Sequence, residues 1–286
     1  METQRIDAAG FRSQQQDRWN SAASGWNTWS RLTDAAAGHI CDRLVALAGV
    51  QAGSRVLDVA AGYGEPALTA ARVAGENGRV VATDLSSEML GFGRERAAAA
   101  GVGNLEFIEA DASSLDFPEA TFDAAVSRWG IIFEPDGEKA AASVRRFLKP
   151  GGRFAISSWG TPDQVPLLAL PMRVATQRFG FVPPPPGTPG PLSRPTPAAL
   201  GGLLEGGGFS DVEVELAEAT FTFESPDQYA DYVVAIAAPV HAVLAESPPG
   251  TEQLLREEIV RVSSELSGGD GPVSLSNSVL LASGVA

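Results

Sequence analysis

Short apolar segments and amphipathic helices alternate along residues 55–158, and this alternation constrains the fold more than any other feature of the chain. The predicted strands are Arg55–Val59, Arg79–Thr83, Leu105–Glu109, Phe122–Ser127 and Arg153–Ser158. The predicted helices between them are Pro66–Ala74, Ser86–Ala100 and Gly137–Leu148. Strands that alternate with helices at this pace predict an α/β fold, with a parallel sheet covered by helices on both faces.

The flanking segments predict additions to this sheet. Residues 11–50 have apolar side chains at helical spacing and contain three of the five Trp residues. Residues 183–197 hold eight Pro and predict a semi-rigid connector. After it we expect a helix at Pro197–Gly206, one or two strands in Phe209–Phe223, helices at Asp227–Ala245 and Glu252–Leu266, and a terminal strand in Pro272–Ala286. We therefore divide the chain into a helical cap, 1–50, and a core, 51–286, with insertions at 160–200 and 225–270.

Charge and composition exclude several classes of protein. The 35 acidic residues exceed the 21 basic ones by 14, and the bases form no run, which argues against a nucleic-acid partner. The single cysteine, Cys41, rules out an internal disulfide, and no His/Cys group has zinc spacing. We see neither an apolar leader at the N-terminus nor a stretch long enough to span a membrane, so we expect a cytoplasmic protein without a metal.

The segment after the first predicted strand carries the strongest functional signal. Gly62 and Gly64 permit a tight turn that a ligand can approach closely. The spacing Gly62-x-Gly64-x-x-Ala67, with Asp84 20 residues after Gly64, fits a dinucleotide fingerprint and an NAD(P)-dependent oxidoreductase. Asp58 weighs against that interpretation, because its carboxylate would repel a pyrophosphate at this turn and would attract an ammonium group.

Three aspartates recur at or near the ends of successive predicted strands. Asp58, Asp84 and Asp111 follow one another at intervals of 26 and 27 residues. In a doubly wound sheet this spacing places the three carboxylates along one edge, where open α/β folds bind ligands. Such a row suits a ligand with an amine, a ribose diol and an exocyclic adenine amine. The alternative is that each aspartate only caps a helix or forms a turn.

Taken together, these segments resemble class I S-adenosylmethionine-dependent methyltransferases. VLDVAAGYGE resembles the glycine motif, VVATDLSSEML the ribose segment and IEADASSLDF the adenine segment, while FDAAVSRWGIIF and LKPGGRFAISSW resemble the fourth and fifth strand segments. The match covers roughly residues 40–160, with a weaker part through GGGFSDVEV. It implies a Rossmann-like, doubly wound, mostly parallel seven-stranded sheet. One departure is Ala60, which stands where the family usually has the first glycine; we expect binding to survive it.

The resemblance implies S-adenosyl-L-methionine as the cofactor and a role for each matching position. Asp58 and the turn residues Ala60, Gly62 and Gly64 would hold the methionine part. Asp84 would accept both ribose hydroxyls, and Leu85 and Met89 would pack on the adenine faces. Asp111 and the Ala112 backbone would read the adenine amine. Ser127 and the backbone after it would line the sulfonium side.

The acceptor side is less defined. A general base is needed only when the acceptor must lose a proton, and His39 and His241 are candidates, as are Glu134 and Asp136. The Trp-rich cap with Trp26, the Arg128-Trp129 pair, Trp159 and the two insertions are candidates for acceptor binding. Length and the Trp-rich start resemble the quinone- and natural-product-methylating branch, which implies a small hydrophobic or aromatic acceptor.

Two other functions remain open at this stage. One is the oxidoreductase, and the other is a protein that binds the cofactor without methylating. The acceptor, the attacking atom and the existence of a homodimer are not determined by these motifs.

Overall fold

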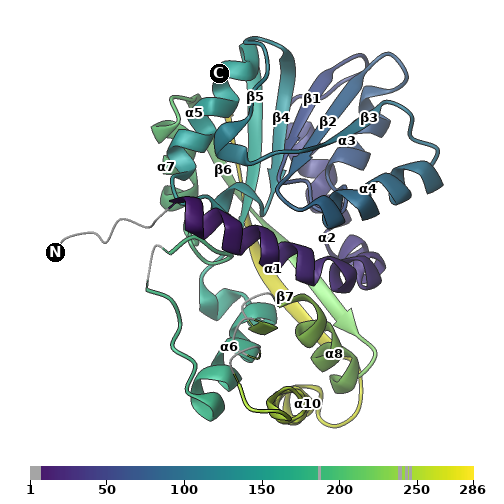
Figure 1. Cartoon of the computed structure of the whole chain (residues 1–286), viewed down its shortest axis with the longest axis vertical. Helices are drawn as coiled ribbons and strands as arrows, with labels where there is room; N and C mark the ends of the chain where they lie inside the picture. The colour runs from purple at the N-terminus through teal and green to yellow at the C-terminus, as the bar shows by residue number, and fades with distance from the viewer. Residues whose placement is uncertain (1–7, 186–187, 238–239, 242–243, 245–246) are drawn as a thin grey trace, which may run out of the picture.

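A computed structural model describes residues 8–185, 188–237, 240–241, 244 and 247–286. Its centre is a seven-stranded sheet in the order β3-β2-β1-β4-β5-β7-β6 (Figure 1). Strands β1 to β5 run parallel, and β7 lies antiparallel between β5 and β6. The strands are β1 Arg55–Val59, β2 Arg79–Asp84, β3 Leu105–Glu109, β4 Phe122–Arg128, β5 Leu148–Trp159, β6 Ser210–Phe223 and β7 Val273–Val285. The predicted doubly wound α/β fold is confirmed.

Helices cover both faces of the sheet. On one face α2 and α3 pack in a core with the apolar side chains of β1, β2 and β4, while α4 packs against β2 and β3. On the other face α5 and α7 pack with β4, β5 and β7. The helices are α1 Ala8–Thr28, α2 Ser30–Leu47, α3 Ala67–Ala74, α4 Ser87–Ala99, α5 Gly137–Phe147, α6 Pro166–Phe179, α7 Pro197–Gly206, α8 Pro226–Ile236 and α10 Thr251–Ser267. Short 3₁₀ turns are η1 Ala112–Ser114, η2 Ile131–Phe133 and η3 Pro162–Gln164.

Local sequence explains where several of these helices begin. Side chains of Ser86, Asp136, Thr196 and Ser225 each accept the backbone N–H three residues further on. Such caps satisfy an N–H that has no partner inside the helix. In α7 and α8 a proline follows the cap at a position where its missing N–H costs nothing.

The additions differ in detail from the sequence prediction. The N-terminal region forms two helices that meet at Trp29, and β6 is one long strand. Helix α6, within the insertion at 160–200, was not predicted. The predicted helix at 227–245 is described as α8 as far as Ile236, and its later part, like Pro186 of the proline-rich connector, falls partly outside the described residues.

Helix α1 crosses the edge of the sheet at which the parallel strands end, and α6, α8 and α10 lie together on its other side (Figure 1). The cap and the second insertion therefore meet beside the carboxyl ends of the strands. Within the described residues, no helix is long and apolar enough to cross a bilayer.

Substitutions at two glycines measure how closely α1 packs against α8. A Cβ on Gly25 would overlap the carbonyl oxygen of Ala235, whereas a Cβ on Gly38 of α2 would meet nothing within 4 Å. We expect Gly25→Ala to lower the free energy of unfolding by about 1–3 kcal/mol, as overpacking does. Gly38→Ala should raise it by about 0.5–1 kcal/mol, because alanine is the better helix former. Urea unfolding measures both, and changes of the same sign would contradict the close α1–α8 contact.

Candidate functional site

The turn between β1 and α3 adopts a left-handed backbone at three positions. The φ angles are +57° at Ala60, +54° at Gly62 and +107° at Gly64. The two glycines adopt this conformation freely, whereas Ala60 does so at a cost of about 1–2 kcal/mol. The loop after β4 packs directly on the turn, since a Cβ on Gly130 would come within 2.5 Å of the Ala60 Cβ. The alanine that departs from the family pattern thus keeps the backbone conformation expected of the usual glycine.

Asp84 holds this turn from the neighbouring strand. It follows Thr83, which pairs with Val59, so its carboxylate lies beside the start of the turn. One oxygen accepts the Gly62 N–H at 2.8 Å and the other accepts the Ser86 N–H at 2.9 Å. Burial raises the pKa of Asp84, although these backbone donors oppose the rise. Each carboxylate oxygen has a second lone pair, so the side chain can still accept ribose hydroxyls.

Asp58 is a buried carboxyl group near the end of β1. Its side chain is fully buried, and in the described part of the chain neither carboxylate oxygen has a hydrogen-bond partner. Burial raises the pKa of Asp58 well above its ordinary value, while Arg128 and the backbone of Ala67 at the start of α3 oppose the rise. A buried carboxylate without a partner is costly, and an ammonium group beside it would remove that cost. Asp58 therefore fits the amine of the expected cofactor.

Asp111 lies after β3 and caps η1, with one oxygen accepting the Ser113 N–H at 2.9 Å. Its other oxygen pairs with Nε of Arg12 at 2.8 Å, which comes from α1. Ala112 is buried at the start of η1, and its role in binding the adenine amine stays a prediction. The structure thus brings the predicted adenine segment under α1.

Helix α1 also contacts the ribose segment. Gln16 donates to the carbonyl oxygen of Leu85 at 3.0 Å, and Asn20 accepts from the Ser86 hydroxyl at 2.6 Å. Met89 is buried with Ala23 and Tyr63 in a small cluster between α1 and α4. None of the α1 contacts was predicted from sequence, because polar residues on a helix usually face solvent.

Of the tryptophans predicted for the acceptor side, Trp26 and Trp129 lie next to the glycine turn and the end of β4, and Trp159 lies behind Trp129. Trp26 stacks on Tyr63 with ring centroids 6.1 Å apart, and Trp129, at a φ of +53°, follows β4 directly. The indole nitrogens of both are buried without a hydrogen-bond partner within the described residues. Trp159 is 6% exposed and stacks behind Trp129 at 4.1 Å, so it supports that ring. The Ser127 hydroxyl accepts the Ile131 N–H at 3.0 Å and so shapes the loop on the predicted sulfonium side.

The two histidines each hydrogen-bond to main chain. Nε2 of His39 lies 2.7 Å from the Glu218 oxygen on β6, and Nε2 of His241 contacts the Val234 oxygen on α8. Their catalytic role stays a prediction. Glu134, which follows η2, has its pKa raised to about 7 by burial and by the charge of Asp111. Among the described residues, no group of three or more His, Cys, Asp or Glu side chains could hold a metal.

Sequence reasoning missed two residues at the centre of the site. Tyr63, inside the glycine turn, is buried between Trp26 and the guanidinium of Arg96, which lies 4.6 Å from the phenol ring centroid. Arg128 was predicted only for the acceptor side, yet the structure buries it against Tyr63 and Cys41. A lone cation at the end of a buried apolar strand was the signal for Arg128.

Comparison with known proteins supports the resemblance to methyltransferases. Residues 40–177 match the model of the ubiE/COQ5 methyltransferase family. The chain is 42% identical over 120 residues to the ubiquinone/menaquinone biosynthesis C-methyltransferase UbiE of Cronobacter sakazakii, covering 42% of this chain and 48% of that protein. It is 36% identical over 171 residues to UbiE of Pseudomonas fluorescens, covering 58% and 61%. The chain spans about half the length of the curated relatives it matches.

Solved structures share the fold at low sequence identity. A phosphoethanolamine N-methyltransferase 2 from Haemonchus contortus, solved with S-adenosylhomocysteine, has a TM-score of 0.59 at 18% identity, covering 96% of this chain and 60% of that one. The [4+2]-cyclase SpnF has a TM-score of 0.56 at 16% identity, covering 93% and 96%. These structures confirm the Rossmann-like fold. The family match and the UbiE relatives support the resemblance to class I S-adenosylmethionine-dependent methyltransferases.

Proposed function

We propose that this chain transfers a methyl group from S-adenosylmethionine to a small hydrophobic or aromatic acceptor. The observation that carries the proposal is the buried carboxyl group of Asp58 beneath the Ala60–Gly64 turn, for which the described part of the chain provides no hydrogen-bond partner. A dinucleotide would bring a pyrophosphate to this turn, and its negative charge would be repelled by Asp58. The amine of a methionine part would be attracted, which favours the methyltransferase over the oxidoreductase.

The remaining cofactor contacts would come from residues placed along the same edge. Asp84 would hold the ribose hydroxyls while it keeps the turn in shape through the Gly62 N–H. Leu85 and Met89 would flank the adenine, and Asp111 with the Ala112 backbone would bind its amine. Arg12 of α1 occupies one oxygen of Asp111, so α1 would close over the adenine end.

Catalysis by these residues would consist mainly of orientation and exclusion of water. When bound, S-adenosylmethionine supplies a methyl group already activated on a sulfonium. The chain then has to hold the acceptor in line with that group and keep the site dry. Trp129 would line the predicted sulfonium side. Its ring stacks on Trp159, and its backbone N–H donates to the Ser157 hydroxyl at 3.0 Å. The buried indole N–H groups of Trp26 and Trp129, which have no hydrogen-bond partner among the described residues, would bind an oxygen of the acceptor.

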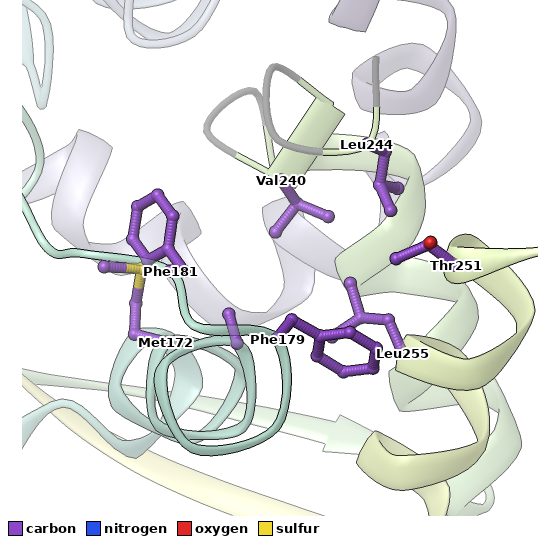
Figure 2. A pocket seen from close by; sticks show the side chains of 8 residues that line it. Met172, Phe179, Phe181, Val240, Leu244, Thr251 and Leu255 are labelled. Carbon is purple, nitrogen blue, oxygen red and sulfur yellow. The ribbon is translucent and has the colours of Figure 1, made fainter. Parts of the chain in front are cut away.

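The two predicted insertions pack against each other through apolar side chains. Figure 2 shows a pocket between α6 and α10, formed by side chains from both segments. Apart from Thr251 its lining is apolar: Met172, Ala175, Phe179, Phe181, Val240, Leu244 and Leu255. Because α6, α8 and α10 lie on the far side of α1 from the adenine segment, this helical part would complete the acceptor side.

Three further properties remain predictions. They are a role of His39, His241 or Glu134 as general base, a homodimer and a cytoplasmic location.

Titration calorimetry tests the proposal most directly. We expect S-adenosylhomocysteine to bind and NADH not to bind, and the reverse result would reject the methyltransferase. A screen of quinone and aromatic acceptors with labelled S-adenosylmethionine would then identify the reaction. The likeness to the [4+2]-cyclase SpnF makes a non-methylating function the second candidate, because it shows this fold in an enzyme named for another reaction. Cofactor binding without methylation of any acceptor would favour that candidate.

A further inference from the structure

Arg128 is a buried cation at the carboxyl end of β4. Asp58 pairs in register with Val126, and Arg128 follows two residues later, so both charged side chains lie on the same face of the sheet. Arg128 is 8% exposed, and it stands level with the beginning of the Ala60–Gly64 turn. None of the cofactor or acceptor contacts in the proposed function involves Arg128.

The two side chains that hydrogen-bond to Arg128 are neutral, and the nearby Glu65 carboxylate pairs with Arg72 instead. Within the described residues, Nη1 contacts the Cys41 thiol at 3.1 Å and Nη2 donates to the Tyr63 hydroxyl at 3.2 Å. The guanidinium also lies 5.3 Å from the centroid of the Trp129 ring. Burial by itself lowers the pKa of Arg128, but Cys41, Tyr63 and Glu65 raise it, so the side chain stays charged. Burial raises the pKa of the Cys41 thiol to about 11, so the thiol is no counter-ion.

A buried arginine of this kind normally has a carboxylate partner. Buried charges are paired because removing an ion from water costs several kcal/mol, and the planar guanidinium fork matches a carboxylate. Asp58 is near enough for Arg128 to oppose the rise in its pKa, yet the two side chains form no hydrogen bond. Within the described residues, the Asp58 carboxyl group and the Arg128 cation therefore lie beside one turn without a hydrogen bond between them.

A single chemical group satisfies both charges at once. An α-amino acid carries an ammonium and a carboxylate on one carbon. These match, side by side, the Asp58 carboxyl group, which has no hydrogen-bond partner among the described residues, and the Arg128 cation, which has no carboxylate partner there. A neutral acceptor would leave Arg128 unpaired, and a simple amine would satisfy Asp58 alone.

We propose that Arg128 binds the α-carboxylate of the methionine part of the cofactor, while Asp58 binds its ammonium group. This inference rests on the proposed function and names the residue that selects the amino-acid end of the ligand. Tyr63 and Cys41 are positioning residues, because they hold the guanidinium without touching the ligand in this scheme. A carboxylate on the acceptor is the other source of the same chemistry, and the experiment separates the two.

The test compares two ligands on two proteins by calorimetry. One ligand is S-adenosylhomocysteine, and the other is its decarboxylated analogue, 5′-S-(3-aminopropyl)-5′-thioadenosine. Wild type should prefer the carboxylate-bearing ligand by about 10–100-fold, the range of a charged hydrogen bond. Arg128→Gln should lose most of this preference while its affinity for the decarboxylated analogue stays within about three-fold of wild type.

Arg94→Gln is the matched control, because Arg94 also lies over an aromatic ring, that of Phe107 on β3, and makes no contact with the glycine turn among the described residues. It should keep the wild-type preference for the carboxylate. If Arg128→Gln does not fold, Arg128→Lys and Tyr63→Phe provide the readout: each should reduce the preference several-fold, since Lys lacks the fork and Phe no longer holds it.

The outcomes that overturn the proposal are distinct from failure of the proposed function. Equal losses for both ligands in Arg128→Gln would make Arg128 a structural residue. If Arg128→Gln keeps the wild-type preference for S-adenosylhomocysteine but has a higher KM for a carboxylate-bearing acceptor, Arg128 binds the acceptor instead. If wild type binds neither ligand, the methyltransferase assignment fails with it; if wild type binds both equally, only the role of Arg128 fails.

Discussion

Replacing Asp84 by alanine is expected to weaken S-adenosylhomocysteine binding by about 100-fold, or about 2.7 kcal/mol. Two effects add in the same direction. The variant loses the acceptor of the ribose hydroxyls, and it also releases the Gly62 N–H and the Ser86 N–H, which Asp84 holds at 2.8 Å and 2.9 Å. The glycine turn then becomes free to move, and its preorganisation for the ligand is lost.

A ligand without the ribose hydroxyls separates the two effects. Binding of the 2′,3′-dideoxy analogue should fall less in Asp84→Ala than binding of S-adenosylhomocysteine, because only the turn is affected. Asp123→Asn is the control: its carboxylate also accepts a backbone N–H, from Arg55, but at the opposite end of the strands. Unchanged affinity in Asp84→Ala would remove this residue from the site, and an equal loss for both ligands would leave it as a support of the turn alone.

Replacing Asp58 by asparagine should stabilise the ligand-free protein and weaken cofactor binding. Burial raises the pKa of Asp58 in the folded state above its unfolded value, so the folded chain holds a proton that the unfolded chain releases. The stability of wild type should therefore fall as pH rises above the ordinary aspartate pKa and stop falling once pH passes the raised value. Asparagine carries no proton to lose, so this fall should be absent, with a gain of about 1–3 kcal/mol at neutral pH.

Ligand binding reports on the same carboxylate. An ammonium group beside Asp58 favours its charged form, so wild type should release a proton on binding S-adenosylhomocysteine within that pH window. Calorimetry in buffers of different ionisation enthalpy measures this proton release. In Asp58→Asn the proton release should be absent, and the affinity for S-adenosylhomocysteine should be about 10–100-fold lower. A variant less stable than wild type at neutral pH, with undiminished affinity, would contradict the assignment of Asp58.

Local patterns were sufficient to predict most of the elements. The strands β1, β3 and β4 and the helix α7 lie where the period of apolar residues and the caps place them, because both signals act over a few neighbouring residues. Helix α6 was not predicted: it lies in the segment leading into the proline-rich connector and contains Pro171. The single antiparallel strand, β7, was predicted as a strand, but its place between β5 and β6 depends on pairing across the whole chain.

In the candidate site, too, some residues could be predicted from the sequence and others could not. Asp58, Asp84 and Asp111 could be found because each follows a strand signal and the spacing repeats. The roles of Arg12, Gln16 and Asn20 could not, since they depend on how α1 lies over the sheet. The partners of Arg128 are separated from it by 87 residues at Cys41 and 65 at Tyr63, distances over which a sequence pattern carries no information about contact.

The sequence by itself therefore determined the class of fold, the glycine turn and the row of carboxylates, because strand ends in a parallel sheet always meet at one edge. Only the tertiary structure decided which of these charges is satisfied. Packing of α2 and α3 buries Asp58 and Arg128 on one face of the sheet without joining them, whereas Asp84 is held by backbone N–H groups and Asp111 by Arg12. Burial and pairing are properties of the packed chain, and they turn a row of similar aspartates into distinct binding groups.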